Sequence, residues 1–570
     1  MGSINYKLIV ISVIITLFVG GCMTEPADQA KLQTAVAVVE PEQPLPDFSI
    51  HVQEEARQES VVAAAVVAQR VAGAPQAKSR MMFYEAMPAA GIAQLRAPSE
   101  PRNRENYARF SDNPLYRVAE DPFSTFSIDV DTGAYSNMRR MLNAGNRPVQ
   151  DAIRTEELIN YFSYDYPQPK RKNTPFSITT EVGPTPWNAD TQLLHIGIQG
   201  YDVPRAQLPA ANLVFLVDVS GSMQSPDKLE LLKSALRLLV RELQAEDQVS
   251  IVVYAGASGV VLEPTAGDRT ATITAALDGL TAGGSTNGGA GIRLAYALAQ
   301  QAFIKDGINR VILATDGDFN VGTVDFEMLK QLVEERRAQG IGLTTLGFGS
   351  GNYNDHLMEQ LADAGNGNYA YIDTLSEARK ALVDEMSSTL MTIAKDVKIQ
   401  VEFNPATVAE YRLIGYENRA LARADFSNDK IDAGEIGAGH SVTAIYEIAL
   451  TGSAGQRLDG GRYQPEQRAT ANTSELALVK LRYKKPDAAT STLIERPVRK
   501  ADIVKNLGQA SGDYRFAAAV AGFGQILRGG KYTGDFSYPE VLVLARGARG
   551  DDPFGYRGEF LQLTNLASSL

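Results

Sequence analysis

Cysteine is almost absent from this chain of 570 residues, and so are the residue patterns of several common functional sites. The single cysteine, Cys22, excludes an intrachain disulfide. The four histidines, His51, His195, His356 and His440, lie far apart in the sequence and form no zinc-binding spacing. The formal net charge of −12 leaves no basic stripe for phosphate groups, which argues against a nucleic-acid partner.

The fingerprints of the common enzyme classes are also missing. The sequence contains no phosphate-binding loop and no dinucleotide-binding glycine pattern. Ser220 and Ser222 do not lie in a Gly-x-Ser-x-Gly turn, which a hydrolase nucleophile of that type requires. The sequence therefore predicts no catalytic residues, although residues distant in the sequence can still assemble a site.

The amino terminus lacks an apolar run long enough to span a bilayer comfortably. Lys7 precedes a short apolar stretch, residues 8–19, which suits the core of a signal peptide. The stretch ends in Val19-Gly20-Gly21-Cys22, which resembles the lipobox of bacterial lipoproteins. The resemblance implies a signal peptide at residues 1–21, cleaved before Cys22, and a diacylglyceryl group on the Cys22 thiol. The alternatives are an uncleaved anchor helix or a cysteine that follows a signal peptide by chance.

Lipidation of Cys22 would place the protein in the envelope of a bacterium. Two or more acyl chains give stable membrane anchoring, whereas one chain is marginal. Met23 follows the cysteine where an aspartate would favour the inner membrane, so by resemblance to lipoprotein sorting we expect the outer membrane. Residues 23–104 have no steady apolar period, so we predict that residues 22–104 comprise the lipidated cysteine and a disordered tether.

Polar side chains follow the apolar run at residues 213–217. Asp218, Ser220 and Ser222 stand two residues apart, and in extended backbone such side chains point the same way. They can therefore project together from the carboxyl end of a buried strand, where open parallel sheets bind ligands.

Two residues further along the chain complete this pattern. Thr286 lies in a glycine-rich loop, residues 283–289, and Asp316 follows an apolar strand at residues 311–314. Together with Asp218, Ser220 and Ser222 they resemble the metal-ion-dependent adhesion site of the von Willebrand factor type A family. The resemblance implies that Ser220, Ser222 and Thr286 bind the ion directly, while Asp218 and Asp316 hold it through water.

These residue types suit a hard divalent cation. Oxygen ligands favour Mg²⁺, Mn²⁺ or Ca²⁺, and Mg²⁺ fits best because it accepts few protein ligands and keeps water. With neutral hydroxyls as direct ligands, the ion would keep much of its charge and attract an Asp or Glu carboxylate of a protein partner. A serine-rich turn without an ion is the alternative.

Strand and helix patterns alternate between residues 205 and 392. Ser225 is a candidate N-cap and Pro226 a candidate first helical residue, followed by apolar residues at spacings of three and four: Leu229, Leu232, Leu236, Leu239, Val240 and Leu243. Further strands are predicted at residues 249–254, 311–314, 343–348 and 369–372, and further helices at residues 292–303, 325–339, 354–364 and 375–391. The alternation predicts an α/β fold, a doubly wound and mostly parallel sheet with helices on both faces.

An accessory region is expected before this domain, at residues 105–204. Within it Asp129 and Asp131 resemble the nucleophile and general acid of haloacid-dehalogenase-type phosphatases, but Gly133 stands where that family usually has Thr or Val. Together with residues 155–162, this segment more closely resembles the amino-terminal accessory region of bacterial lipoproteins that carry a type A domain.

A second accessory region, β-rich with a helix, is expected at residues 393–570. Residues 397–403, 441–448 and 476–483 alternate like half-buried strands, which predicts a small antiparallel sheet. A helix at residues 514–527 carries a stripe that we interpret as core: Phe516, Val520, Phe523 and Leu527. Arg549-Gly550-Asp551 spells a tripeptide that some integrins recognise, but a turn is the better explanation.

The sequence therefore favours a membrane-anchored binding module that is not an enzyme. Its ion would accept an acidic residue of another protein, in adhesion or in the assembly of an envelope complex. The alternative is a metal-dependent envelope hydrolase that uses the same ion as a Lewis acid. A cytoplasmic ATPase or chelatase machine is disfavoured by the export signal.

Overall fold

The computed structural model describes residues 105–170, 174–285, 288–317, 326–351, 353–459 and 473–570. The predicted signal peptide, the predicted lipidation site Cys22, the predicted tether and the predicted metal ligand Thr286 lie outside the described residues. Within the described ranges, no helix combines the length and the apolar character that a membrane span requires.

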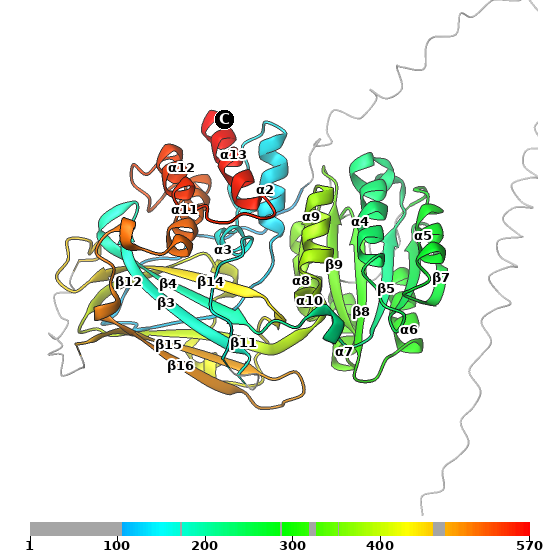
Figure 1. Cartoon of the computed structure of the whole chain (residues 1–570), viewed down its shortest axis with the longest axis horizontal. Helices are drawn as coiled ribbons and strands as arrows, with labels where there is room; N and C mark the ends of the chain where they lie inside the picture. The colour runs from blue at the N-terminus through cyan, green and yellow to red at the C-terminus, as the bar shows by residue number, and fades with distance from the viewer. Residues whose placement is uncertain (1–104, 171–173, 286–287, 318–325, 352, 460–472) are drawn as a thin grey trace, which may run out of the picture. The chain divides into compact units, whose positions relative to one another are not determined.

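A six-stranded sheet forms the centre of the segment at residues 205–392 (Figure 1). The strand order is β10-β9-β8-β5-β6-β7, parallel throughout except for β7, which pairs with β6 as an antiparallel edge. The strands are β5 (Ala211–Asp218), β6 (Gln248–Tyr254), β7 (Ser258–Ala266), β8 (Ile308–Thr315), β9 (Gly342–Phe348) and β10 (Tyr369–Ile372). The predicted doubly wound, mostly parallel sheet is confirmed, and β7 is an addition that the sequence did not predict.

The central strand β5 is buried along its whole length, as expected where helices cover both faces. On one face Leu213 and Phe215 pack with residues of α4, and on the other Val214 and Leu216 pack with residues of α6. The helices of this domain are α4 (Leu231–Val240), α5 (Thr270–Asp278), α6 (Gly288–Gln301), α7 (Phe326–Ala338), α8 (Asp355–Ala364), α9 (Leu375–Arg379) and α10 (Met386–Leu390).

Two of the predicted helices differ in detail. The helix after Ser225 begins with a π-helical turn, η5 (Pro226–Glu230), before α4, and the Ser225 hydroxyl makes no capping hydrogen bond. The single helix predicted at residues 375–391 is divided into α9, the π-helix η6 (Lys380–Asp384) and α10. A π-turn widens the helix by one residue and is often found at functional sites.

Two five-stranded sheets pack face to face beside the α/β domain (Figure 1). One has the order β1-β12-β14-β4-β3, and the other has the order β13-β11-β15-β16 with β2 paired to β11. Their strands are β1 (Tyr116–Arg117), β2 (Phe123–Ser127), β3 (Phe176–Thr185), β4 (Asn188–Gly200), β11 (Thr392–Phe403), β12 (Val408–Ile414), β13 (Ile436–Gly437), β14 (Ser441–Leu450), β15 (Glu475–Lys484) and β16 (Thr492–Arg499). This pair of sheets is called the sandwich below.

Both accessory segments contribute strands to the sandwich. β14, from the carboxy-terminal segment, pairs with β4, from the amino-terminal one, and β11 likewise pairs with β2. The expectation of one small sheet within residues 393–570 is therefore wrong, because β14 lies in a different sheet from β11 and β15. The alternating patterns located these strands but carry no information on their partners.

Helices cover the outer face of the first sheet, against residues such as Leu193 of β4 and Ile445 of β14 (Figure 1). They are α2 (Gly133–Asn143), α3 (Thr155–Asn160), α11 (Gly512–Leu527), α12 (Tyr538–Arg546) and α13 (Tyr556–Ser569). The predicted core stripe of α11 is confirmed, since Phe516 and Phe523 are fully buried. The tripeptide Arg549-Gly550-Asp551 lies exposed in the loop between α12 and α13.

Short helical turns connect several of these elements. They are η2 (Gln150–Ala152), η3 (Arg205–Gln207), η4 (Gly221–Gln224), η7 (Glu417–Arg419), η8 (Arg423–Ser427), η9 (Lys500–Asp502) and η10 (Leu507–Gln509). Of these, η4 matters most for the predicted site, because it carries Ser222.

Candidate metal-binding site

The two aspartates of the predicted site lie at the same edge of the parallel sheet. Asp218 is the last residue of β5, and Asp316 directly follows the neighbouring parallel strand β8. Both carboxylates are fully buried. The topology therefore brings together two residues that are far apart in the sequence, at the carboxyl ends where such sheets bind ligands.

Three hydrogen bonds fix the Asp218 carboxylate. The Ser220 amide donates to Oδ1 at 2.8 Å, while the Thr315 hydroxyl and the Tyr254 hydroxyl donate to Oδ2 at 2.9 and 3.1 Å. Burial raises the pKa of Asp218, and the negative charge of Asp316 acts in the same direction, against the hydrogen bonds from Ser220. Orientation by three donors suits an aspartate that contributes charge behind the direct ligands.

The two serines also meet as the spacing predicts. Ser220 has extended backbone, and Ser222 lies in the short helix η4 that follows. Their hydroxyl oxygens are 2.9 Å apart, and Ser220 is almost fully buried. Two hydroxyl oxygens thus lie side by side near the edge of the sheet where Asp218 and Asp316 are located.

The glycine-rich loop that leads to Thr286 contacts the same segment. The Gly221 amide donates to the Gly284 carbonyl at 3.0 Å, and the Gly283 amide donates to the Val219 carbonyl at 2.7 Å. Gly284 has a φ of +87°, a conformation that favours glycine. The structure therefore brings this loop to the serines up to residue 285, and Thr286 itself is outside the described residues.

A lysine that the sequence did not single out completes the site. The Nζ atom of Lys228, in η5, lies 2.8 Å from Oδ2 of Asp316, and Lys228 is itself buried. Its aliphatic stem crosses Gly349, where an added Cβ would overlap the Lys228 side chain. The only signal in the sequence was a lysine beside Leu229 at the start of an amphipathic helix, a position that is usually solvated.

The donor set fits a hard divalent cation. Paired hydroxyls and two buried carboxylates are ligands that Mg²⁺, Mn²⁺ or Ca²⁺ accept. Two buried carboxylates also require positive charge nearby, and Lys228 supplies part of it at Asp316. When bound at Ser220 and Ser222, an ion would supply the rest and offer a coordination position to an external carboxylate.

Asp129 and Asp131 occupy a different environment from the one a phosphatase requires. Both are buried, Asp129 accepts a hydrogen bond from Nε of Arg419 at 2.9 Å, and Asp131 accepts one from the Tyr369 amide at 2.8 Å. Since Tyr369 belongs to β10, its contact with Asp131 joins the accessory regions to the α/β domain, whereas the contact of Arg419 with Asp129 lies within the accessory regions. They favour a structural role for the pair.

Further charged side chains extend this junction. Arg154 contacts Glu157 of α3, and it reaches Asp355 and Glu359 of α8 at 2.5 and 3.8 Å. Arg419 also contacts Glu359, at 3.0 Å. We call Arg154, Arg419, Asp129, Glu157, Asp355 and Glu359 the buried junction; its oxygens from Asp129, Glu157 and Glu359 lie within 4.8 Å of one another. The two guanidinium groups hold these carboxylates together.

Comparisons with known proteins agree with this architecture. Three family models match: "von Willebrand factor" at residues 101–195, "von Willebrand factor type A domain" at residues 213–318, and "Uncharacterized protein YfbK, C-terminal" at residues 388–570. The chain is 48% identical over 472 residues to the uncharacterized protein YfbK of Escherichia coli (strain K12). The aligned region covers 81% of each of the two chains.

More distant similarities extend to other organisms. An uncharacterized protein of Synechocystis is 30% identical over 186 residues, covering 32% of this chain and 43% of that relative. Among solved structures, a von Willebrand factor type A protein from Catenulispora acidiphila matches 68% of this chain and 89% of its own at 16% identity and a TM-score of 0.38. The conserved hypothetical protein BatB from Bacteroides thetaiotaomicron matches 31% of this chain and 97% of its own at 22% identity and a TM-score of 0.27.

Proposed function

This chain belongs to the YfbK family of proteins with a von Willebrand factor type A domain, and on that premise we propose that it binds a protein partner through a divalent cation. The ion, most suitably Mg²⁺, would be held by Ser220, Ser222 and Thr286, with Asp218 and Asp316 behind water. The partner would offer an Asp or Glu carboxylate. Mn²⁺ and Ca²⁺ are the alternative ions.

One observation carries this proposal. Asp218 and Asp316 are fully buried at the ends of neighbouring parallel strands, next to a pair of serine hydroxyls 2.9 Å apart. Buried carboxylates are costly unless paired with positive charge, so their presence at an otherwise polar edge supports a cation site. Lys228 supplies part of this charge through its contact with Asp316.

The chemistry of the ligands supports binding rather than catalysis. Neutral serine hydroxyls leave a divalent ion with most of its charge, which favours an anionic ligand in the open position. The metal-dependent hydrolase would need a base within reach of ion-bound water. No contact of Asp218, Ser220 or Ser222 in the described part of the chain favours that alternative, so we propose that the protein is not an enzyme.

The proposed location is the bacterial envelope, with the lipid on Cys22 as anchor. Its support is the Val-Gly-Gly-Cys sequence after an apolar stretch and the use of the single cysteine at that place. An envelope protein that holds its binding domain on a long amino-terminal segment could reach a partner in the same or a facing membrane. The outer membrane is the location that Met23 favours.

Calorimetric titration of Mg²⁺, Mn²⁺ and Ca²⁺ into the purified full chain tests the ion site. We expect saturable binding at one site that Asp218→Asn abolishes, because the substitution removes a buried charge while keeping the size of the side chain. Asp278→Asn is the matched control, since Asp278 lies on α5 and makes only a surface ion pair with Arg237. Equal binding by wild type and Asp218→Asn would contradict the proposal.

A second experiment tests the partner. Membrane proteins captured by the immobilised chain in Mg²⁺ should be released by EDTA and should not be captured by Asp218→Asn. Candidate partners are then tested with their acidic residues replaced by the corresponding amides. Capture that survives both EDTA and Asp218→Asn would show that the partner binds elsewhere.

A further inference from the structure

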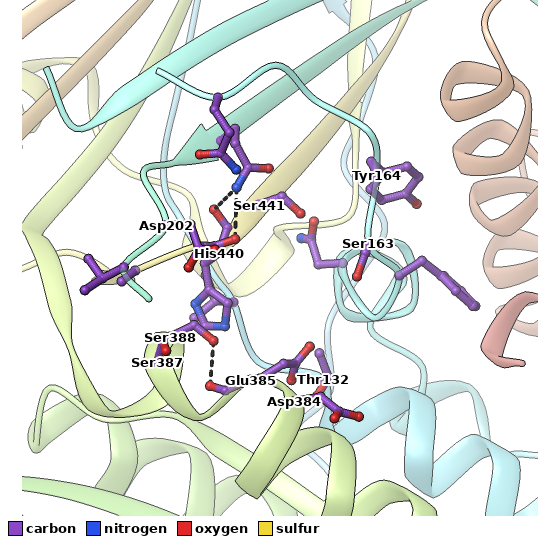
Figure 2. A pocket seen from close by; sticks show the side chains of 18 of the residues that line it. Thr132, Ser163, Tyr164, Asp202, Asp384, Glu385, Ser387, Ser388, His440 and Ser441 are labelled. Carbon is purple, nitrogen blue, oxygen red and sulfur yellow. Dashed lines mark hydrogen bonds between the residues drawn. The ribbon is translucent and has the colours of Figure 1, made fainter. Parts of the chain in front are cut away.

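A cavity of about 430 Å³ lies away from the predicted metal site, where three parts of the chain meet (Figure 2). Its walls come from the segment between β2 and β3, from residues 202–205 that lead into the α/β domain, and from the last helices of that domain with the loop before β14. The volume falls within the range of about 300–1,000 Å³ that small-molecule sites occupy.

Polar side chains dominate the walls of this cavity. Figure 2 shows hydroxyl groups facing the hollow from separate segments, including Ser163, Ser387 and Ser441. Ser388 also lines it, with its hydroxyl donating to the Glu385 carbonyl at 2.7 Å. Such walls suit a ligand that forms hydrogen bonds and disfavour a purely apolar one.

The charged groups of the cavity are mostly acidic. Asp202, Asp384 and Glu385 line it, against one cation, Arg205, which is paired with Glu242. Glu385 is neutralised by Lys380 at 2.5 Å, whereas the cation nearest to Asp384 among the described residues is Arg379, 3.6 Å away and largely exposed. Asp202 has no ion-pair partner in the described part of the chain. The excess of carboxylate charge favours a cationic ligand and disfavours phosphate or carboxylate ligands.

Asp202 is held at the cavity by the turn before β14. The Gly439 amide donates to the Tyr201 carbonyl at 2.9 Å, and Gly439 has a φ of +80°. A Cβ at residue 439 would stand 3.1 Å from Oδ1 of Asp202, so the carboxylate lies directly over this glycine. The backbone on both sides of the cavity is thus fixed, as a preformed site requires.

His440 also lines the cavity. Its Nδ1 is buried and has no hydrogen-bond partner within the described residues. Burial lowers the pKa of His440 to about 3, so the ring is neutral and does not oppose a cation. His440 therefore contributes a neutral wall to the cavity.

Aromatic side chains lie along one side of the hollow. Phe162 and Tyr164, from the loop after α3, both line it, and Figure 2 shows Tyr164 next to Ser163. Both rings are nevertheless buried in the core, with Phe162 packed against Phe516 and Tyr164 stacked on Tyr166, so they form a wall and no free aromatic face. The volume of about 430 Å³, together with the hydroxyl groups on the walls, favours an organic ammonium over a simple metal ion.

We propose that this cavity binds a small ligand that carries a primary ammonium group and hydroxyl groups, as amino sugars and amino alcohols do. The carboxylates of Asp202 and Asp384 attract the ammonium, while the serine hydroxyls bind the ligand hydroxyls. The inference goes beyond the proposed function, because none of these residues belongs to the predicted metal site.

The test is calorimetric titration of the purified full chain with matched probes. Glucosamine represents amino sugars and ethanolamine represents amino alcohols, while N-acetylglucosamine and glucose are neutral counterparts. We expect at least one of the two amines to bind at least tenfold more tightly than the neutral sugars, because only the amines carry positive charge at neutral pH. Tighter binding of glucosamine would indicate an amino sugar as the ligand, and tighter binding of ethanolamine would indicate an amino alcohol.

Two substitutions assign the binding to the cavity. Asp202→Asn and Asp384→Asn should each weaken amine binding about fivefold or more, since each removes one carboxylate charge from a partly exposed side chain. Asp487→Asn, in the exposed turn between β15 and β16, is the matched control and should change nothing. EDTA should also leave the affinity unchanged, which separates this site from the metal site.

Three results would overturn the proposal. One is the absence of binding by both amines, and another is equal affinity for glucosamine and N-acetylglucosamine. The third is unchanged amine affinity in the Asp202→Asn, Asp384→Asn double variant, provided that its melting temperature matches that of the wild type.

Discussion

The ammonium group of Lys228 lies 2.8 Å from Oδ2 of Asp316, and both side chains are buried at the edge of the sheet that carries the predicted metal ligands. Lysine is compact and strongly hydrated, so its burial requires a carboxylate partner. A protein cation and a metal ion would therefore share the negative charge of Asp316. The affinity of the site for its ion should depend on this lysine.

Replacing Lys228 by methionine tests that dependence. The loss of a buried ammonium leaves Asp316 uncompensated, which should destabilise the metal-free protein by about 3–5 kcal/mol. Mg²⁺ then restores more stability than it does in the wild type, so the Mg²⁺-induced rise in melting temperature should be larger. Lys233→Met, on the same helical segment but paired with Glu230, is the control. An identical Mg²⁺-induced rise in Lys228→Met and wild type would show that the lysine does not affect the ion.

Gly349 allows the Lys228 side chain to reach Asp316. Gly349 has a φ of +75°, and a Cβ there would overlap the Lys228 stem. Gly349→Ala should therefore destabilise the protein by about 2–4 kcal/mol in urea unfolding, from backbone strain and overlap together. Gly351→Ala is a control for strain alone, because Gly351 has a φ of +95° with nothing near its Cβ position. Equal losses of stability in Gly349→Ala and Gly351→Ala would show that the overlap with the Lys228 side chain contributes nothing.

Arg154 should be among the residues on which stability depends most. Its guanidinium bridges Glu157 of α3 and Asp355 of α8 in the buried junction. Arg154→Met leaves these carboxylates without their cation and should cost about 3–5 kcal/mol. Arg109→Met, at an exposed arginine whose contact with Asp151 is 3.5 Å long, should change stability by less than about 0.5 kcal/mol. A loss below 1 kcal/mol in Arg154→Met, measured by chemical unfolding, would contradict the assigned role.

Ionisation of Glu156 should lower the free energy of unfolding as the pH rises. Burial raises its pKa to about 8 in the folded protein from an ordinary value of 4.5, and its Oε2 has no hydrogen-bond partner in the described structure. The folded state therefore binds the proton more tightly, so this contribution is complete below pH 4.5 and is lost as the pH approaches 8. The slope from one such group is about 1.4 kcal/mol per pH unit.

Glu156→Gln should flatten that slope, because a glutamine cannot ionise. The free energies of unfolding of wild type and Glu156→Gln, measured between pH 5 and 8.5, should be similar at the low end of this range. At pH 8.5 the variant should be the more stable of the two. Glu246→Gln, at an exposed glutamate, should keep the wild-type slope. Parallel curves for wild type and Glu156→Gln would show that Glu156 is ionised in the folded protein.

Cys22→Ser tests the proposed anchor. Without the thiol no diacylglyceryl group can be attached, so the variant should move from the membrane fraction to the soluble fraction of the cell. Labelling with a radioactive fatty acid should be lost at the same time. A variant that stays in the membrane fraction would indicate an uncleaved anchor helix instead.

The α/β domain was predictable because its signals are local. The buried run at residues 213–217 and the polar residues Asp218, Ser220 and Ser222 lie within one strand and the turn after it. Parallel strands all end at one edge, so Asp316 could be assigned to the same place from its position after its own strand. The contact of Asp316 with Lys228 could not be predicted, since it depends on a π-helical turn at residues 226–230.

The sandwich was harder to predict because its pairings are not local. The alternating pattern of residues 441–448 identified a strand, but nothing in it shows that Tyr446 lies opposite Leu194. Glu156 and Glu157 begin a short helix, where charged residues are usually solvated, and the structure buries both. Glu157 is paired with the nearby Arg154, but Asp355, Glu359 and Arg419 of the buried junction come from distant segments, so sequence patterns could not reveal it.

The pairing of β4 with β14 has a consequence for biogenesis. The residues of β4 leave the ribosome well before their neighbours in β14, since the entire α/β domain is made between them. Until β14 arrives, one edge of β4 presents unpaired backbone groups that could associate with other chains. The newly made chain should therefore depend on a chaperone until its carboxy-terminal third has emerged.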